Sequence, residues 1–420
     1  YRALREHLET RADYAGWVPD VENLAAARDA AFDEEGFALD GSWWRAFRYK
    51  PFLGTFWPTN GSTDDVMIRL APEFYHDASG NPSREIYKLN LAILEAALST
   101  PNNVPQDALN RLVEPVDEAL ISFDLDGNNV IEAGATRIQQ LPPFYAGQAF
   151  DIEVQRFLYP VGTEFLHTVR YVDPDQDDLI AARMKEVRYA RRELPMSLER
   201  LRQIYIKELE EKDLGNLPVF IGSGEVGLVN NFSWRYQGFI ESAEGHLRSQ
   251  TEEETLFCMG CHSTIGVTAD QSFAFPRKVP GESGWGYQNV TGIKDVPQAS
   301  KSTPEILEYF QRVKGADEWR ANDEALDRFF VNGEVNEAEV RRAAPGGDQD
   351  ISFLISPSRE RALALNKGYM ALVGDQDFEL GRDPVPEPAT QVFERIEGNG
   401  STDLGDSGLI FNDGRIWLEW

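Results

Sequence analysis

Two cysteines and a histidine lie together in the last third of the chain and could carry cofactor chemistry. Cys258 and Cys261 are the two cysteines among 420 residues, and His262 follows directly, in the pattern Cys-x-x-Cys-His. This spacing is the attachment pattern of a c-type haem, in which the thiols add to the vinyl groups and the histidine binds the iron from the proximal side. The pattern therefore predicts one covalent haem at these three residues.

Two other kinds of site fit part of this pattern. A structural zinc ion normally takes four ligands, and only three candidate ligands lie near one another here. A thioredoxin-like dithiol pair follows a strand, whereas Thr251 and Glu254 have the capping-box spacing that begins a helix just before the motif. Zinc and a dithiol pair stay as alternatives to haem.

The sixth ligand of a haem iron decides whether the protein transfers electrons or acts on small molecules. His167 alternates with Phe165, Val169 and Tyr171, which predicts a buried strand position, either as a core histidine or as a distal haem group. Met370 also follows the motif, but on a predicted helix, where methionine commonly packs in a core. Further candidates to pair with the haem propionates are Arg156, Arg170, Arg183 and Arg188. Further candidates to bind the iron are Met184 and Met196.

An acidic loop over residues 124–135 resembles the first part of an EF-hand calcium loop. Its oxygen ligands would be Asp124, Asp126, Asn128, the backbone carbonyl of Val130, and Glu132. Asn129 replaces the turn glycine, which asparagine can do because it accepts the left-handed conformation. The bidentate glutamate of the twelfth position is absent, since Ala135 stands there. We predict a calcium site that is weak unless another acid completes it, with an Asx-rich turn as the alternative.

The chain is acidic and has the composition of a globular protein. Its formal net charge is −29 and 42% of its residues are hydrophobic, so it can form a core, while its charge disfavours nucleic acid and anionic membrane surfaces. The same charge would favour a basic redox partner protein. No apolar run approaches the roughly 18–20 residues of a membrane span. Because covalent haem is attached outside the cytoplasm, we expect an exported protein, either periplasmic or extracellular.

The periodicity of apolar residues predicts an α+β fold of mixed helices and antiparallel strands. The predicted helices cover residues 2–14, 21–32, 83–98, 105–122, 178–193, 197–212, 303–313 and 357–373. The predicted strands cover residues 150–158, 163–172, 217–221 and 225–236, with a C-terminal hairpin at 408–411 and 415–420.

These elements predict three parts of the chain. Residues 1–60 form an N-terminal helical and aromatic segment, and residues 61–245 form a mixed α/β domain that holds the EF-hand-like loop at 124–135. Residues 246–420 form a mainly helical, loop-rich region that binds haem c and ends in the hairpin.

The haem motif and its helical lead-in, residues 250–270, resemble c-type cytochromes. The resemblance implies thioether bonds at Cys258 and Cys261, iron ligation at His262, and electron transfer between redox partners. The chain departs from these cytochromes in its length and in having no methionine at the usual distance from the motif. A haem enzyme of the peroxidase or oxidase kind, with an open distal site, and a haem-bearing sensor or subunit of a larger assembly stay as alternatives.

Overall fold

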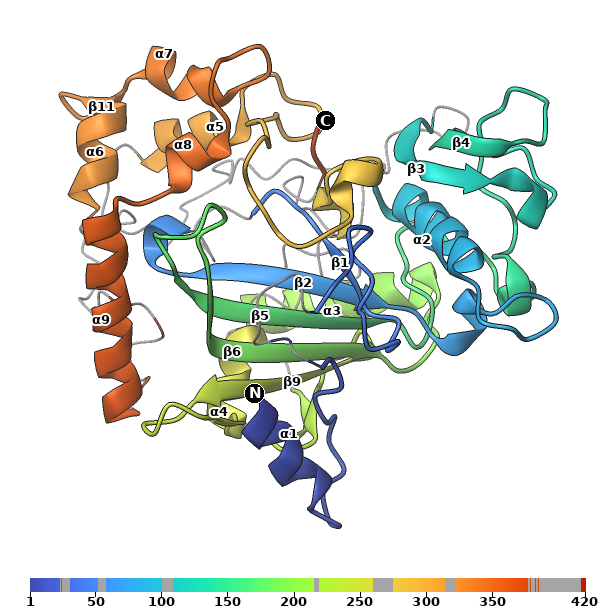
Figure 1. The fold of residues 1–420 in the computed structure, drawn as a ribbon, viewed down its shortest axis with the longest axis horizontal. Helices are drawn as coiled ribbons and strands as arrows, with labels where there is room; N and C mark the ends of the chain where they lie inside the picture. The colour runs from blue at the N-terminus through green and yellow to red at the C-terminus, as the bar shows by residue number, and fades with distance from the viewer. Residues whose placement is uncertain are drawn as a thin grey trace.

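An antiparallel sheet of eight strands forms the centre of the computed structural model of the protein (Figure 1). Seven strands follow the order β1-β2-β5-β6-β9-β8-β7, and β10 pairs with β9. Their bounds are β1 Arg45–Phe47, β2 Thr63–Arg69, β5 Glu164–Val172, β6 Ile180–Arg192, β7 Ile221–Ser223, β8 Gly227–Val229, β9 Trp234–Glu241 and β10 Leu247–Ser249. The strand predicted at 163–172 is confirmed as β5, and the strand predicted at 225–236 is divided between β8 and β9.

The structure describes residues 1–22, 24, 31–51, 58–99, 109–214, 219–259, 275–313, 322–376, 378, 382, 384 and 417–420. Most of the helix predicted at 21–32, Cys261 and His262 of the haem motif, and residues 408–411 and 415–416 of the predicted C-terminal hairpin lie outside these ranges. None of the helices in the described part combines the length and the apolarity that a membrane span requires.

Both faces of the central sheet are buried, which is why β5 shows no simple alternation of buried and exposed residues. Phe165 packs in the larger hydrophobic cluster, with helix α2 (Arg84–Ser99). Its neighbour Leu166 points to the opposite face and packs in a second cluster, with Leu4 and Leu8 of helix α1 (Arg2–Glu9). The sheet therefore separates two hydrophobic layers.

The helix predicted at 178–193 is wrong, because this segment forms β6. Alanine, methionine and lysine favour a helix locally, and that preference dominated the prediction. In the fold, β6 lies between β5 and β9 and bonds to both, so that Val187 lies between Thr168 and Phe239. A strand buried in the middle of a sheet is set by pairing and burial rather than by intrinsic propensity.

A small lobe of α2 and a separate hairpin lies beside the sheet (Figure 1). The hairpin consists of β3 (Arg111–Asp117) and β4 (Ala133–Ile138), and the short 3-10 helix η5 (Glu118–Leu120) follows β3. The helix predicted at 105–122 is therefore wrong, whereas α2 confirms the helix predicted at 83–98. Pro115 interrupts a helical pattern but is tolerated in an irregular edge strand such as β3, which carries register shifts.

The predicted strand at 150–158 is also wrong, since these residues form turns and loops. Phe150 follows the 3-10 helix η6 (Gly147–Ala149) and is largely exposed, so its alternation with Ile152 and Val154 does not reflect a buried strand face.

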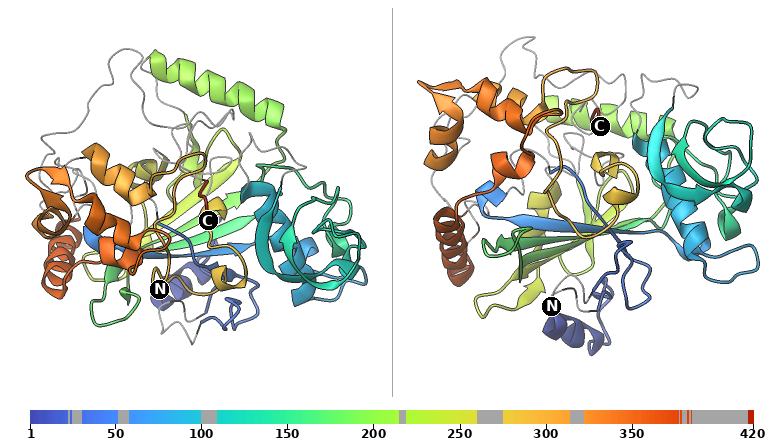
Figure 2. Two further views of the ribbon diagram at one scale, coloured as in Figure 1. Left: turned by 90° about the horizontal axis from the view of Figure 1, so that it is seen from above. Right: turned by 45° about the horizontal axis from the view of Figure 1, so that its top comes forward.

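Helices gather in the C-terminal part beside the sheet (Figure 2), where α5 to α8 share a hydrophobic cluster and α9 packs in another with Tyr171 of β5. They are α5 Glu305–Val313, α6 Asp323–Phe329, α7 Glu337–Val340, α8 Ile351–Ile355 and α9 Arg359–Asp375, with the short hairpin of β11 Phe330–Val331 and β12 Glu334–Val335. The helices predicted at 303–313 and 357–373 are confirmed as α5 and α9.

Helix α3 (Leu198–Asp213) confirms the helix predicted at 197–212 and begins where a cap was expected, since the Ser197 hydroxyl accepts a bond from the Arg200 N–H. An α+β fold of helices and antiparallel strands is therefore confirmed. The part boundaries near 60 and 245 stay a prediction, although the sheet joins β1 to β2 across the first of them.

Candidate functional site

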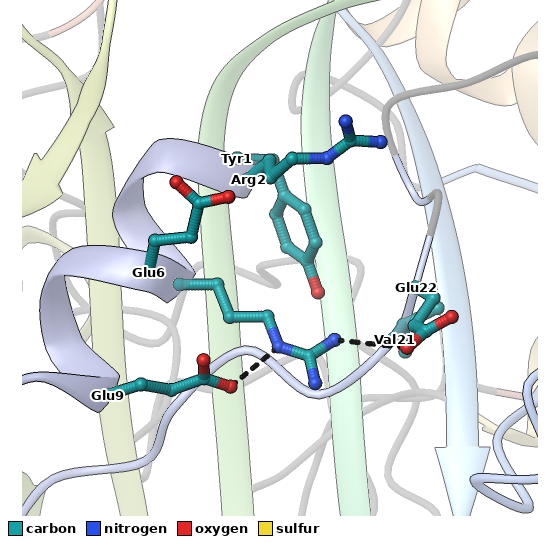
Figure 3. Close-up of a pocket in the computed structure, with 7 residues that line it drawn as sticks. Tyr1, Arg2, Glu6, Glu9, Val21 and Glu22 are labelled. Atoms are coloured by element: carbon teal, nitrogen blue, oxygen red, sulfur yellow. Dashed lines mark hydrogen bonds and ion pairs between the residues drawn. The ribbon is translucent and has the colours of Figure 1, made fainter.

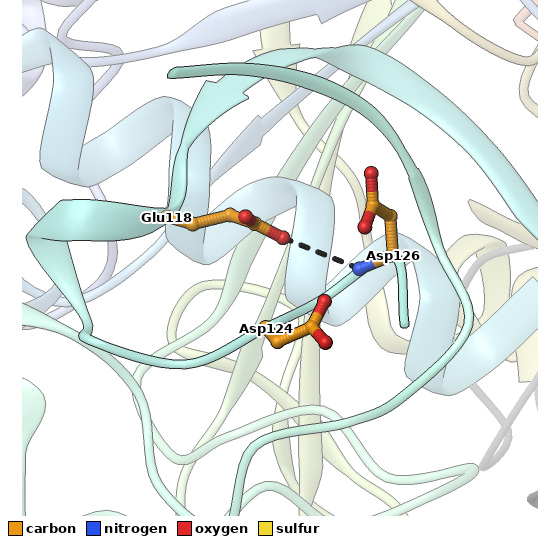
Figure 4. Close-up of side chains that lie close together, drawn as sticks. All are labelled: Glu118, Asp124 and Asp126. Carbon is orange, nitrogen blue, oxygen red and sulfur yellow. Dashed lines mark hydrogen bonds between the residues drawn. The ribbon is translucent and has the colours of Figure 1, made fainter. Parts of the chain in front are cut away.

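Glu118 is the buried anchor of the acidic loop that connects β3 to β4. Its side chain is fully buried, and its carboxylate accepts backbone N–H bonds from three residues of the loop. The donors are Leu125 at 2.7 Å, Asp126 at 3.2 Å and Glu132 at 3.1 Å. One carboxylate therefore holds both ends of the loop, and Figure 4 shows it directed at the backbone of Asp126.

The predicted ligands Asp124, Asp126 and Asn128 each cap a turn inside this loop. Asp124 accepts from the N–H groups of Gly127 at 2.7 Å and Asn129 at 2.8 Å. Asp126 accepts from the Asn128 N–H at 3.0 Å, as expected of an Asx turn. Asn129 adopts a φ of 65°, so the expectation that it could replace the turn glycine is confirmed.

Three of the loop's carboxylates converge. An oxygen of Glu118, of Asp124 and of Asp126 all lie within 4.8 Å of one another (Figure 4). Glu132 is held nearby, since its carboxylate accepts from the Asn128 side-chain amide at 3.1 Å. The sequence pattern identified both aspartates but missed Glu118, because this residue precedes the loop and occupies no position of the EF-hand pattern.

The sequence indicates Glu118 as a ligand only once the strand pairing around the loop is known. Asp117 and Glu118 end an apolar-alternating segment six residues before Asp124. An acid at that distance reaches the loop only if β3 and β4 form a hairpin that returns the chain to its start, whereas the sequence pattern predicts a helix there. With the hairpin in place, Glu118 supplies the additional acid that Ala135 does not.

His167 lies on β5 as predicted and is nearly buried. Its Nε2 is 3.0 Å from Oδ2 of Asp64 on β2, and the hydroxyl of Tyr49 donates to the same carboxylate oxygen. Burial, with the charge of Asp64 beside it, raises the pKa of Tyr49 well above its usual range. The structure therefore shows His167 as a core histidine with an acidic partner, and a distal haem role stays a prediction.

The other candidates for haem contacts lie in the sheet, in α9 and in loops, and all but Met370 have structural partners in the described part. Arg170 pairs with Asp65 at 2.7 Å, and Met370 is 47% exposed on α9. The remaining contacts are those of Arg183 with Glu241, Arg188 with Glu186, Arg156 with the ring of Phe157, and Met184 and Met196 with hydrophobic clusters.

The helical lead-in to the haem motif is confirmed as α4 (Glu252–Met259). Thr251 and Glu254 form the predicted capping box, with the Glu254 N–H bonded to the Thr251 hydroxyl at 3.2 Å and the Thr251 N–H bonded to the Glu254 carboxylate at 2.9 Å. Cys258 lies in the last turn of α4, beside the buried Met259. Cys261 and His262 lie outside the described residues, so haem attachment stays a prediction.

A polar pocket of about 310 Å³ lies against helix α1 (Figure 3). Arg5 crosses it, 2.8 Å from Glu9 and 3.9 Å from Glu22. The other lining residues are Tyr1, Arg2, Glu6 and Val21. Arg5 is thus paired with two of the three glutamates that line the pocket.

Comparisons with known proteins overturn the cytochrome interpretation. A family of lipoproteins matches residues 12–346 of the chain. An uncharacterized lipoprotein of Aquifex aeolicus (strain VF5) is 31% identical over 443 aligned positions, which cover 94% of this chain and 72% of the relative. No solved structure matches the chain.

The assignment to c-type cytochromes and to electron transport is therefore wrong, because the resemblance covers one short motif whereas the lipoprotein match spans most of the chain. The redox partner protein loses its support with it, as do the haem enzyme and the haem sensor. Export agrees with these matches. The chain is a member of this lipoprotein family.

Proposed function

We propose that this protein is an exported, lipid-anchored protein of the cell envelope that binds Ca²⁺ at the loop between β3 and β4. The observation that carries the calcium site is the convergence of Glu118 with Asp124 and Asp126 within 4.8 Å. Support for the location comes from the lipoprotein family, and the periplasm and the cell exterior both fit it.

The donor set suits calcium chemically. Calcium takes six to eight oxygen ligands at about 2.3–2.6 Å, from carboxylates, carbonyls, amides and water. Besides the three carboxylates, the loop offers the Asn128 side-chain oxygen, the Val130 carbonyl and the Glu132 carboxylate, the positions predicted from the EF-hand pattern. Glu118 replaces the missing bidentate glutamate from the opposite side of the loop. Magnesium demands a stricter octahedron and releases its water reluctantly, so it fits this flexible oxygen set less well.

A bound calcium ion would stabilise the folded loop because it relieves the repulsion among the carboxylates. Without a cation, three negative groups lie close together at the end of the hairpin, opposed by backbone N–H donors and by the Asn128 side-chain amide, which donates to Asp126 at 3.1 Å. A divalent cation relieves that repulsion and fixes the loop. Because the loop lacks the twelfth-position ligand, we expect a dissociation constant of about 0.1–1 mM, the range of extracellular calcium modules.

Calcium is expected to raise the melting temperature of the purified protein by about 1–2 °C when its concentration is ten times the dissociation constant. The change Asp126→Asn removes one charge from the cluster and keeps an acceptor for the Asn128 N–H, so it should abolish this increase. Differential scanning calorimetry with calcium or with EGTA measures the shift, and titration calorimetry measures binding.

Asp77→Asn is the matched control. Asp77 caps a similar exposed turn, accepting from Ser79 at 2.8 Å and from Asn81 at 2.9 Å, and lies outside the acidic group. This variant should respond to calcium as the unchanged protein does. If calcium produces no heat of binding and no shift in the unchanged protein, the proposed site is wrong.

A covalent haem at Cys258, Cys261 and His262 stays a prediction, and with it a haem-binding role for the C-terminal third. Its support is the Cys-x-x-Cys-His spacing together with the capped helix α4 that leads into it. No electron-transfer role is attached to it. A pyridine haemochrome assay on protein purified from a host that exports and matures c-type haem should give a c-type spectrum, which the double change Cys258→Ser and Cys261→Ser should remove. A colourless protein from that host would contradict the prediction.

A further inference from the structure

An Asn-Gly pair forms the tip of the short hairpin between β11 and β12. Val331 pairs with Glu334, so Asn332 and Gly333 are the two central residues of the turn. Both have positive φ angles, 54° and 82°, as a type I′ turn requires. Both residues are exposed, and a Cβ atom built on Gly333 would meet no other atom within 4 Å. The peptide bond between them therefore stands open to water.

No hydrogen bond to the part of the chain that the structure describes holds the reactive groups of this pair. The Asn332 side chain has no bonded partner there, and neither has the backbone N–H of Gly333. Glycine also has no side chain that would shield its nitrogen. The Gly333 nitrogen and the amide carbon of the Asn332 side chain, which are close along the chain, are thus both accessible.

We propose that Asn332 is a site of covalent modification, at which the side-chain amide is lost by attack of the following backbone nitrogen. The Gly333 nitrogen forms a bond to Cγ of Asn332, and the bond from Cγ to the side-chain NH₂ group breaks. The proton of the Gly333 N–H leaves with that group as ammonia, which produces a five-membered succinimide. The reaction needs no enzyme and no oxidant.

Water then opens the succinimide in one of two ways. Hydrolysis at Cγ gives aspartate, and hydrolysis at the backbone carbonyl carbon gives isoaspartate, in which the main chain runs through the former side chain. Either product adds one negative charge at the tip of the hairpin. Isoaspartate also lengthens the main chain by one methylene group, which a two-residue type I′ turn does not accommodate.

The chain contains the same dipeptide in a different setting, at Asn60-Gly61. Gly61 is buried, and a Cβ atom built on it would lie 2.8 Å from Cβ of Leu365. Its carbonyl accepts a hydrogen bond from the buried ammonium of Lys185 at 2.6 Å. Succinimide formation at Asn60 therefore requires a local opening of the fold, whereas formation at Asn332 does not. A third pair, Asn399-Gly400, lies outside the described residues.

The test is peptide mapping by mass spectrometry of the folded protein during incubation in mildly alkaline buffer, with isoaspartate measured in each peptide. Asn332 is expected to convert at least about ten times faster than Asn60, because an opening that costs only about 1.4 kcal/mol already slows a reaction tenfold. In guanidinium chloride, where the fold no longer distinguishes the two sites, their rates should become similar.

Two variants test the role of the glycine. Gly333→Ala places a methyl group beside the reacting nitrogen and should slow conversion at Asn332 several-fold, with the rate at Asn60 unchanged. Because alanine is strained at a φ of 82°, Gly333→Asn is the second variant, since asparagine accepts the left-handed conformation. Fragmentation of the peptide separates conversion at residue 332 from conversion at residue 333.

Two results would overturn the assignment. One is an equal rate at Asn332 and Asn60 in the folded protein, which would mean that the turn gives Asn332 no greater access than the buried site has. The other is a rate at Asn332 that rises in guanidinium chloride as steeply as the rate at Asn60, since the hairpin would then protect Asn332 in the same way.

Discussion

Replacing Glu95 by alanine is expected to lower the free energy of unfolding by about 3–5 kcal/mol. Glu95 is fully buried on α2 and holds two cations, Arg111 of β3 at 2.8 Å and Lys278 at 2.9 Å. Removing the carboxylate leaves two positive charges in the core without their counter-ion. Urea unfolding followed by circular dichroism measures the loss.

Lys278→Met is the variant to compare with Glu95→Ala. It leaves Glu95 and Arg111 as a balanced pair. It removes the ammonium contacts to Glu95, to the carbonyls of Val279 and Gly281, and to the ring of Trp285, so its cost should be about 0.5–1.5 kcal/mol. If Lys278→Met is as destabilising as Glu95→Ala, unbalanced charge is not the cause.

The same lysine predicts a rise of stability in alkaline solution. Burial is the main reason that the pKa of Lys278 falls from 10.5 to about 8, against the opposing attraction of Glu95. Between pH 8 and 10.5 the unfolded chain therefore binds more protons at this residue than the folded chain does, and the free energy of unfolding rises with pH. Lys278→Met should remove this contribution from the stability profile, and an unchanged profile would contradict the assignment.

Glu305→Gln is expected to have the second large effect, again about 3–5 kcal/mol. Glu305 begins α5, and its carboxylate binds Arg277 at 2.9 Å and also contacts Lys50, all three being buried. Asp295 lies 3.1 Å from Lys50 and accepts the Ile306 N–H at 2.9 Å, so the same network caps the helix. It connects the C-terminal helices to the chain after β1.

Acid should weaken this network over a defined range. Burial alone would raise the pKa of Glu305, but the charges of Arg277 and Lys50 outweigh it and lower the pKa from 4.5 to about 2. The contribution is therefore complete above pH 4.5 and is lost as the pH falls from 4.5 to 2. In Glu305→Gln this part of the acid dependence should be absent, as acid titration of the unfolding free energy can show.

Glu308→Gln, one turn further along α5, is the control for Glu305. Glu308 pairs with Lys301 where both side chains are about a quarter exposed, and such pairs contribute at most about 1 kcal/mol. If Glu305→Gln and Glu308→Gln lower the free energy of unfolding equally, the charge of the helix in general, and not the buried network, determines the effect.

Local patterns predicted well the elements whose signals are local. Ser197 caps α3, and Thr251 and Glu254 cap α4, because a capping bond joins residues three apart in the chain. Apolar periodicity likewise identified α2, α5 and α9. The Cys-x-x-Cys-His motif was an equally local signal, but one short motif did not determine the family, which extends over most of the chain.

The sequence by itself determined the class of fold, the capped helices and the two aspartates of the acidic loop, since each depends on neighbours within a few residues. Only the tertiary structure decided that residues 180–192 form a strand, because pairing with β5 and β9 outweighs a helical preference. It also decided that Glu118 joins Asp124 and Asp126, since that contact depends on the hairpin of β3 and β4 and on the burial of a carboxylate that no local pattern records.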